Sequence, residues 1–477
     1  RGMKRLGGAW GKELAAGAKT PFDDKTFDYI VCVNVMSPLG SRRRLQLLSG
    51  ETPRRPAAVP DGGAGVSSGT RPTPITPGET AFSPGNGALE GVSVAAPQVA
   101  ALIWPHTPVP QGLHMTGNSP GRSMKARPEA LEAMVAQLFV SAGCGEEEAH
   151  VIADHLVEAN LAGHDSHGVI RVPIYLQWMR ESKLFANRPL KVLVDTESLT
   201  VADGQLGFGQ WTGKQSVTIG IEKCRRQGLA LVALRNCAHL GRIGTWAEMA
   251  AAAGFVSLHF VNTSGLGMFV VPYGGRDARL SVNPVCVGVP MADGPPVILD
   301  IAAATTAEGK LKVARNKGVP VPEDTIVDSE GNPTTDADDF YGHEGGFPVG
   351  AILPMGGHRG YGLCLVTELL AGALTGGGCS VPGKDLLEQG MLSIYIDPAR
   401  LGEPSLMMLE VRRFVDFVHT SRPVDPERPV LIPGELEEQT RATRRQGLEL
   451  DETTWNQIVE AAQSYDVPDD LIHAAVI

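Results

Sequence analysis

The sequence lacks most of the motifs that assign a reaction quickly. It has no GxxxxGK[ST] loop and no GxGxxG motif that follows a strand and precedes an acidic residue, so neither a P-loop nor a Rossmann site is indicated. The histidines form no HExxH motif, which argues against a zincin. Apolar runs end well before the roughly 18 residues that a membrane span needs. No membrane partner is therefore expected.

Paired cysteines and excess positive charge are also missing. The seven cysteines are scattered, odd in number and never spaced as CxxC, which predicts neither a disulfide framework nor a zinc-thiolate site and suits a cytoplasmic setting. The chain carries 42 Lys and Arg against 53 Asp and Glu, a formal net charge of -11. Nucleic-acid binders need clustered cations, so no nucleic-acid partner is expected. A small anionic ligand would need local arginines.

Residues 1–123 are poor in core-forming side chains and rich in Pro, Gly, Ser and Thr. Such segments cannot offset the conformational entropy lost on ordering. We predict a disordered or non-native N-terminal extension here. Two alternatives stay open: a targeting peptide, although no apolar region with a small-residue cleavage site stands out, and a natural start at Met115 or Met124.

The pattern becomes periodic at about Pro128, which suits the first turn of a helix. From residue 192 onward, strands and helices alternate, which predicts a mixed α/β unit. Residues 318–350 are rich in turn formers and predict a long surface loop. Asp451 is expected to cap the final helix. Helices are expected at about residues 128–142, 146–162, 169–182, 211–227, 245–253, 303–316, 356–374, 410–419 and 453–464, with a late strand at 392–397.

Four polar segments interrupt this otherwise ordinary core. They read GHDSHGVIR at 163–171, NCAHLGRIG at 236–244, SVNP followed by LDIAAATTAEGK within 281–310, and GGHRGYG at 356–362. The first places two histidines, an aspartate, a serine and an arginine in nine residues. Loops held by rigid elements often carry catalytic groups, so this segment is the first site candidate.

In their order and wording, these segments resemble the malate/L-lactate dehydrogenase family of the non-Rossmann type. That family includes malate, lactate, ureidoglycolate and sulfolactate dehydrogenases and cyclic-imine-2-carboxylate reductases. The resemblance covers about residue 127 to the end and rests on DSHGxxR, NxxHxGxxG, the Asn-Pro strand, LDxA with a later GK, and GGHxGYG. It implies an α/β fold with a non-Rossmann NAD(P)-binding mixed-sheet part at 196–354. A mainly helical part for substrate binding and dimerisation is expected from 124–195 together with 355–477.

The resemblance also implies catalytic roles. Hydride transfer at a hydroxyl-bearing carbon needs a group that takes the hydroxyl proton, and the histidine pKa near 6.5 suits this. His167 is the favoured acid/base, with Ser166 beside it, while His239 stays the alternative. Arg171 is expected to bind the substrate carboxylate through two parallel hydrogen bonds. Lys310 matches a lysine of the hydroxy-acid members, whereas the imine reductases tend to have an acid there.

NAD or NADP is the implied cofactor, and the sequence does not decide between them. Cations and glycine backbone both suit phosphate, so His358 and Arg359 are expected near the pyrophosphate or ribose, although the family commonly has lysine in place of this arginine. Asn283 is expected to contact substrate, and no metal is expected. The implied cofactor-binding residues are His239, Leu240, Gly241, Arg242, Ile243, Asp300, Ile301, Ala302, His358, Arg359, Gly434 and Glu435.

The leading prediction is an oxidoreductase that transfers a hydride between NAD(P) and a small 2-hydroxy acid or 2-oxo acid such as malate, lactate or ureidoglycolate. The first alternative is a reductase of cyclic imino acids such as piperideine-2-carboxylate. A metal-binding module is a second, because the histidines and aspartate of GHDSH with His239 would suffice for zinc. A catalytically silent relative is a third. The resemblance further implies a homodimer or a higher homo-oligomer.

Overall fold

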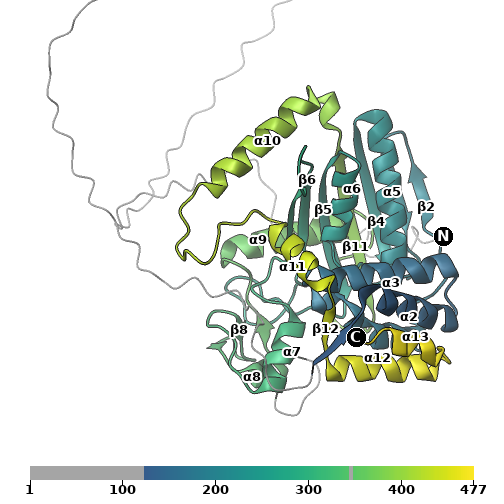
Figure 1. Ribbon diagram of the computed structural model, residues 1–477. Coiled ribbons are helices and arrows are strands. Elements are labelled where there is room, and N and C mark those ends of the chain that lie inside the picture. The colour runs from purple at the N-terminus through teal and green to yellow at the C-terminus, as the bar shows by residue number, and fades with distance from the viewer. Residues whose placement is uncertain (1–122, 343–347) are drawn as a thin grey trace, which may run out of the picture. The chain divides into compact units, whose positions relative to one another are not determined.

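The computed structural model describes residues 123–342 and 348–477 (Figure 1). All but the last residue of the predicted N-terminal extension therefore lies outside the described residues. Residue 123 begins strand β1 (Ser123–Ala126), which pairs antiparallel with β12 (Leu448–Asp451). Within the described ranges, no helix is both long and apolar enough to pass through a bilayer.

A helical part follows β1 and packs around one apolar core. Helix α2 begins with Pro128 in its first turn and buries the residues that the periodicity predicted, among them Leu131, Met134 and Leu138. Asp451 caps α12, because its side chain accepts the backbone N–H of Thr454. Both predictions are confirmed. The helices of this part are α2 (Pro128–Ser141), α3 (Glu146–Leu161), α4 (Val172–Arg180), α12 (Glu452–Ser464) and α13 (Asp469–Ala474).

A seven-stranded sheet in the order β2-β3-β4-β11-β5-β6-β7 forms the second part. Only β3 and β4 are parallel, and every other neighbouring pair in this sheet is antiparallel. Helices α5 (Gly209–Gln227) and α6 (Gly244–Ala252) pack against it. The mixed α/β prediction is confirmed. The strands are β2 (Lys191–Asp195), β3 (Leu199–Asp203), β4 (Leu229–Cys237), β5 (Val256–Gly265), β6 (Val285–Val289), β7 (Val297–Ile301) and β11 (Leu387–Ile396).

Strand β11 lies in the middle of this sheet although it comes from the C-terminal part of the chain. It pairs with β4 on one side and with β5 on the other. The strand predicted at 392–397 is thus present, and it begins five residues earlier. Residues 355–477 therefore contribute to the sheet as well as to the helical part.

The prediction of a long surface loop at residues 318–350 was wrong. The described residues there include β8 (Ile326–Val327), β9 (Pro333–Thr334) and α8 (Ala337–Tyr341), and β8 pairs with β10 (Ala351–Ile352). Ile326 and Phe340 are buried in a core of their own with Leu311 from α7 (Glu308–Lys317). Strands of two residues and a helix of five are too short to show a periodicity in the sequence.

The remaining elements come from the C-terminal part of the chain. Helix α9 (His358–Thr367) continues into a π-helical turn, η3 (Glu368–Ala373), where a single longer helix was predicted. Helix α10 (Pro404–His419) follows the short turn η4 (Pro398–Arg400). Helix α11 (Glu435–Arg444) then leads back to β12. Helix α11 crosses between the sheet and the helical part (Figure 1).

Candidate functional site

The segment GHDSHGVIR forms two short 3-10 turns, η1 (Asp165–His167) and η2 (Val169–Arg171), between α3 and α4. The buried Asn160 side chain at the end of α3 holds both turns. Its Oδ1 accepts the Val169 N–H at 2.8 Å, and its Nδ2 donates to Asp165 Oδ1 at 2.7 Å. A side-chain carbon at Gly168 would lie 2.1 Å from Asn160 Oδ1, so only glycine fits there. The loop is therefore held rigidly.

The structure brings His167 and His239 together. Their rings are stacked with centroids 5.3 Å apart. Ser166 Oγ lies 3.0 Å from His167 Nδ1, and Tyr175 Oη lies 2.6 Å from His239 Nδ1. Gln210 Nε2 in turn donates to Tyr175 Oη at 2.9 Å. Because Nδ1 of each ring already has a hydroxyl partner, Nε2 is the nitrogen that can exchange a proton with a substrate.

Arg171 supplies positive charge beside both rings. Its Nε donates to Ser166 O at 2.6 Å, and the guanidinium still presents two terminal nitrogens, the fork that binds a carboxylate. Burial, followed by the charge of Arg171, lowers the pKa of His167 and of His239 well below 6.5. His167 keeps some exposed surface even so. Both rings are thus neutral near pH 7, which is the form in which a ring nitrogen can act as a base.

The loop that carries His239 is fixed from several sides. The Leu240 N–H donates to Gln389 Oε1 at 2.6 Å, and Gly241, at φ +73°, sits against the His155 ring where a side chain would not fit. The Arg242 side chain is only 2% exposed and donates to both carboxylate oxygens of Glu248, at 2.9 and 2.8 Å. In this structure Arg242 therefore organises the loop, while Ile243 is buried behind it.

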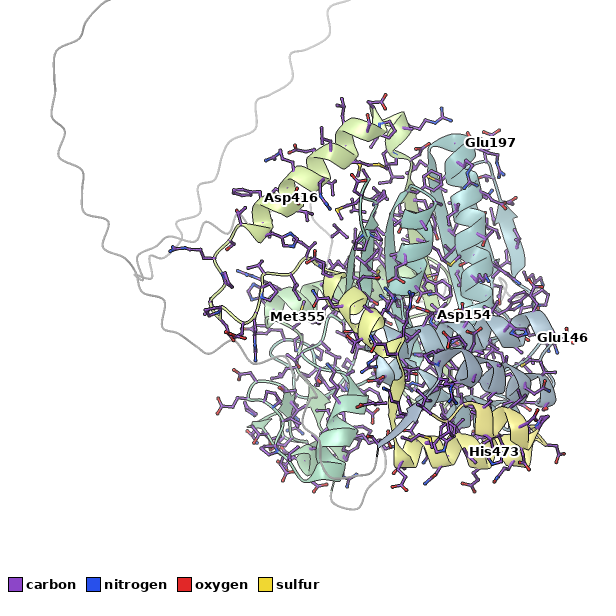
Figure 2. All side chains as sticks on the ribbon, in the orientation of Figure 1. Glu146, Asp154, Glu197, Met355, Asp416 and His473 are labelled. Carbon is purple, nitrogen blue, oxygen red and sulfur yellow. The ribbon has the colours of Figure 1, made fainter. Side chains whose placement is uncertain are left out.

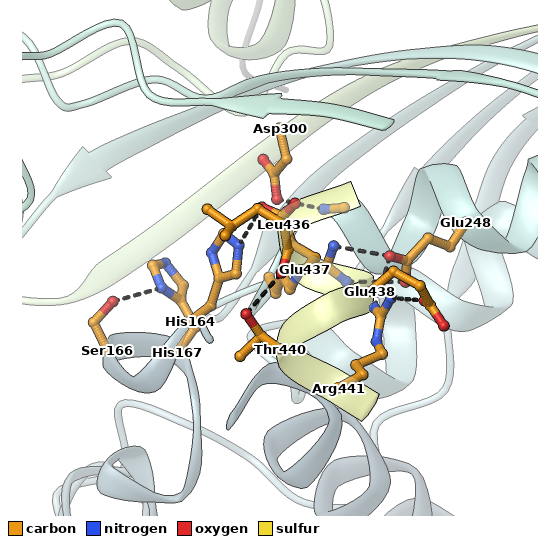
Figure 3. A network of polar contacts seen from close by, with 12 residues as sticks. His164, Ser166, His167, Glu248, Asp300, Leu436, Glu437, Glu438, Thr440 and Arg441 are labelled. Carbon is orange, nitrogen blue, oxygen red and sulfur yellow. Dashed lines mark hydrogen bonds and ion pairs between the residues drawn. The ribbon is translucent and has the colours of Figure 1, made fainter. Parts of the chain in front are cut away.

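Asp300 joins the end of β7 to this loop. Its Oδ2 accepts the Gly244 N–H at 2.7 Å, and burial raises its pKa. Glu437 of α11 lies close by and pairs with His164 Nε2 at 3.3 Å, a hydrogen bond that lowers the pKa of Glu437 (Figure 3). Ile301 and Ala302 follow Asp300 and are partly exposed. The polar segment at 163–171 and the one within 281–310 thus lie close to each other beside α11.

The dehydrogenase interpretation of the sequence gave His164 and Asp165 no role. In the structure both tie the loop to α11, since Arg444 Nη1 contacts Asp165 Oδ1 at 2.6 Å while His164 contacts Glu437. Their partners lie more than 270 residues away along the chain. Only the fold could reveal these contacts.

The start of α7 lies beside Ser166. A side-chain carbon at Gly309 would come within 3.6 Å of Ser166 Cβ, and the exposed Lys310 follows it. His358 and Arg359 are exposed in the first turn of α9. Helix N-termini with nearby cations bind phosphate groups, so this end of α9 fits a dinucleotide.

Two other predicted residues lie in different surroundings. The Asn283 side chain is 0% exposed and donates to Glu368 Oε2 at 2.6 Å and to Cys364 O at 3.1 Å, so a substrate would find no surface of it to contact. Gly434 and Glu435 begin α11, which the Ile298 N–H to Pro433 O hydrogen bond of 3.0 Å ties to β7. Among residues 123–342 and 348–477 there is no cluster of three or more potential metal-ligating side chains, and the metal-module alternative gains no support.

The chain is similar to known proteins both in sequence and in structure. The family model described as malate/L-lactate dehydrogenase matches residues 126–459. Hydroxycarboxylate dehydrogenase B of Escherichia coli (strain K12) is 39% identical over 352 residues, which cover 72% of this chain and 96% of that protein. The structure of sulfolactate dehydrogenase from Methanocaldococcus jannaschii matches with a TM-score of 0.66 at 30% identity, over 73% of this chain and 99% of that one. The Δ1-piperideine-2-carboxylate reductase of Pseudomonas syringae matches with a TM-score of 0.62 at 28% identity, over 71% and 99%.

Proposed function

The chain belongs to the malate/L-lactate dehydrogenase family and is an oxidoreductase acting on the CH–OH group of 2-hydroxy acids, and we propose that its reaction takes place at the His167–His239 pair. The observation that carries this proposal is the stack of two neutral histidines beside Arg171. Oxidation of a 2-hydroxy acid requires from the protein a base that takes the hydroxyl proton and a cationic group that binds the carboxylate. A bound nicotinamide supplies the hydride acceptor.

His167 is the proposed acid/base. Its Nε2 takes the hydroxyl proton during oxidation and returns it during reduction, while Ser166 Oγ at Nδ1 holds the ring in place. His239 is the alternative base. Its ring is oriented by Tyr175, which Gln210 supports. Proton transfer of this kind contributes roughly 100-fold to 10,000-fold in rate.

Arg171 is proposed to bind the substrate carboxylate with its terminal nitrogens, since Nε is already used by the backbone of Ser166. Lys310 lies within the same neighbourhood, because Gly309 faces Ser166. A lysine here favours a carbonyl or hydroxyl substrate, which it can hold by a hydrogen bond. We do not propose a direct contact between Asn283 and the substrate, because Asn283 is completely buried.

The proposed cofactor site is of the non-Rossmann type and belongs to the 196–354 part with contributions from residues beyond it. The sheet is antiparallel at all but one neighbouring pair, so it has no row of parallel strand ends of the kind that builds a Rossmann crevice. The donor chemistry fits NAD(P) at the start of α9, where His358 and Arg359 are exposed beside Gly356 and Gly357. These residues would hold the pyrophosphate.

A homodimer is proposed from exposed apolar surface. On α10, Leu406, Leu409, Phe414 and Phe417 are 57–65% exposed, and the side chains of this helix stand with little protein against them (Figure 2). Leu374, beyond η3, is exposed to a similar degree. Apolar surface on this scale marks protein contacts, and a second copy of the chain is the proposed partner. The six cysteines described are free thiols, which fits the proposed cytoplasmic location.

Reduction of cyclic imino acids is the second candidate, favoured by the structural match to the piperideine-2-carboxylate reductase. Such substrates also carry a carboxylate beside the carbon that is reduced, so Arg171 would bind both classes. The two candidates differ in the atom that takes the proton, oxygen or nitrogen.

A substrate panel tests the proposal. Oxidation of NADH and NADPH by the full chain is followed with pyruvate, oxaloacetate, other 2-oxo acids and piperideine-2-carboxylate. We expect turnover with at least one 2-oxo acid and a loss of roughly 100-fold or more in His167→Ala. His150→Ala, at an exposed position on α3, is the matched control. Turnover of the imine alone would replace the substrate class, and full activity of His167→Ala would remove the role given to His167.

A further inference from the structure

Gln389 is a buried polar side chain that lies outside the four polar segments of the sequence. It belongs to β11, the strand between β4 and β5 in the middle of the sheet (Figure 1), and only 8% of its surface is exposed. A buried amide destabilises a protein unless its donor and its acceptor both have partners. The partners of Gln389 therefore indicate which contacts favour an amide at this position.

Both ends of the Gln389 amide are hydrogen-bonded, and they join two different segments of the chain. Oε1 accepts the N–H of Leu240, the residue after His239, at 2.6 Å. Nε2 donates to Thr263 Oγ1 of β5 at 2.9 Å. The backbone carbonyl of Gln389 also accepts the S–H of Cys237 at 3.0 Å. Gln389 thus ties the loop that carries His239 to β5.

The backbone beside Gln389 is irregular. The register between β11 and β4 shifts between Gln389 and Met391, and Asn236 of β4 has a φ of +52°, which is uncommon for a residue other than glycine. Irregularities such as β-bulges redirect side chains and are over-represented beside active sites. This shift lies where Gln389 contacts the loop that carries His239.

Thr263, the partner of Gln389 on β5, is itself held from the end of α9. Its carbonyl accepts a hydrogen bond from Ser380 Oγ at 3.1 Å, and the Ser380 N–H donates to Glu368 Oε1 at 2.5 Å. Glu368 lies where α9 passes into η3 and is only 3% exposed. These contacts lead from the His239 loop to the helix whose first turn is proposed to hold the pyrophosphate. A buried network with its partners in place rigidifies the protein around it.

Other contacts hold His239 on its remaining sides. A side-chain carbon at Gly209 would lie 2.2 Å from the His239 carbonyl oxygen, so the start of α5 packs directly against this backbone. Tyr175 Oη lies 2.6 Å from Nδ1 of the ring. On the C-terminal side of His239, the next N–H is that of Leu240, whose partner is Gln389.

We propose that Gln389 is a positioning residue that holds His239 in its stack with His167. This inference rests on the proposed function, since it presumes that the reaction takes place at this pair of histidines. Without the Gln389 amide the buried Leu240 N–H would lack its acceptor, and the loop would move to satisfy it. Misplacement of a reacting group by roughly 1 Å can lower the rate about 100-fold.

Two substitutions of Thr263 separate positioning from packing. Thr263→Val keeps the shape of the side chain and removes the hydroxyl that anchors Gln389, whereas Thr263→Ser keeps the hydroxyl and removes a methyl group. We expect Thr263→Val to lower kcat for the 2-oxo acid by roughly tenfold and Thr263→Ser to lower it less than about twofold. The KM should change little, because Arg171 belongs to a different loop. A role in packing alone predicts that Thr263→Ser is the more damaging change.

Gln389→Met tests the amide itself, because methionine has a similar length and lacks the hydrogen-bonding groups. Its kcat should fall by roughly tenfold or more. Gln463→Met, at an exposed position on α12, is the matched control. Melting temperatures verify that each variant is folded, and the Thr263 pair decides the matter if Gln389→Met is not.

Two results would overturn the inference while the proposed function stands. One is a wild-type kcat in Thr263→Val, and the other is a larger loss in Thr263→Ser than in Thr263→Val. A wild-type protein that turns over no substrate of the panel overturns the proposed function, and this inference with it.

Discussion

Arg171 acts through the shape of its side chain as well as through its charge. Lysine keeps the charge but cannot form two parallel hydrogen bonds to a carboxylate. We expect Arg171→Lys to raise the KM for the 2-oxo acid by roughly tenfold and Arg171→Ala to raise it further, since hydrogen bonds between charged groups are each worth about 1.5–3 kcal/mol. Steady-state kinetics with Arg180→Lys, exposed on α4, as control measure this. An unchanged KM would assign the carboxylate to another residue.

The pKa of His167 determines how the rate depends on pH. Burial, with Arg171 as the next cause, holds this pKa well below 6.5, so the base is already unprotonated at neutral pH. The kcat/KM for hydroxy-acid oxidation should therefore stay level down to pH 6.5 and fall only at lower pH. In Arg171→Ala the acid limb should move to higher pH. An acid limb of the wild type at or above pH 6.5 would contradict the assignment.

At the scale of elements, the joint between α3 and the catalytic turns tolerates no added atom. In Gly168→Ala the new methyl would lie 2.1 Å from Asn160 Oδ1. This oxygen accepts the Val169 N–H, and Nδ2 of the same side chain donates to Asp165. Overpacking of this kind costs about 1–3 kcal/mol. We expect a lower melting temperature and a reduced kcat, because Ser166 and His167 move with the loop. Gly402→Ala, where nothing lies within 4 Å, should change neither by much.

For the whole molecule, buried neutral histidines govern stability in acid. Burial lowers the pKa of His155 and of His259 to about 3, whereas the unfolded chain has an ordinary pKa of 6.5. The unfolded state therefore binds more protons between these values, and the folded state loses stability as the pH falls. This contribution is complete above about pH 6.5 and is gone below about pH 3.

Urea unfolding at a series of pH values measures that loss. The free energy of unfolding should decrease steadily below pH 6.5, and the decrease should be smaller in a folded variant that lacks His259. His473→Gln, at an exposed position on α13, should retain the wild-type slope. A slope that is the same in all three proteins would show that other groups control acid unfolding.

The sequence alone determined the features that depend on interactions between neighbouring residues. Periodicity and Pro128 located α2, the Asp451 side chain defined the start of α12, and the order Ser166, His167 and Arg171 put a base and a cation within one loop. Capping, helix periodicity and turn chemistry act over a few residues, so a sequence displays them directly.

Tertiary structure alone decided how these elements meet. It placed β11 between β4 and β5, joined Asp165 to Arg444 across 279 residues, and gave His239 the hydroxyl of Tyr175. Each of these contacts depends on which buried surfaces pack together over the whole chain, and no local pattern records that choice. The pKa values of His167 and His239 follow from the same packing, because burial is what lowers them.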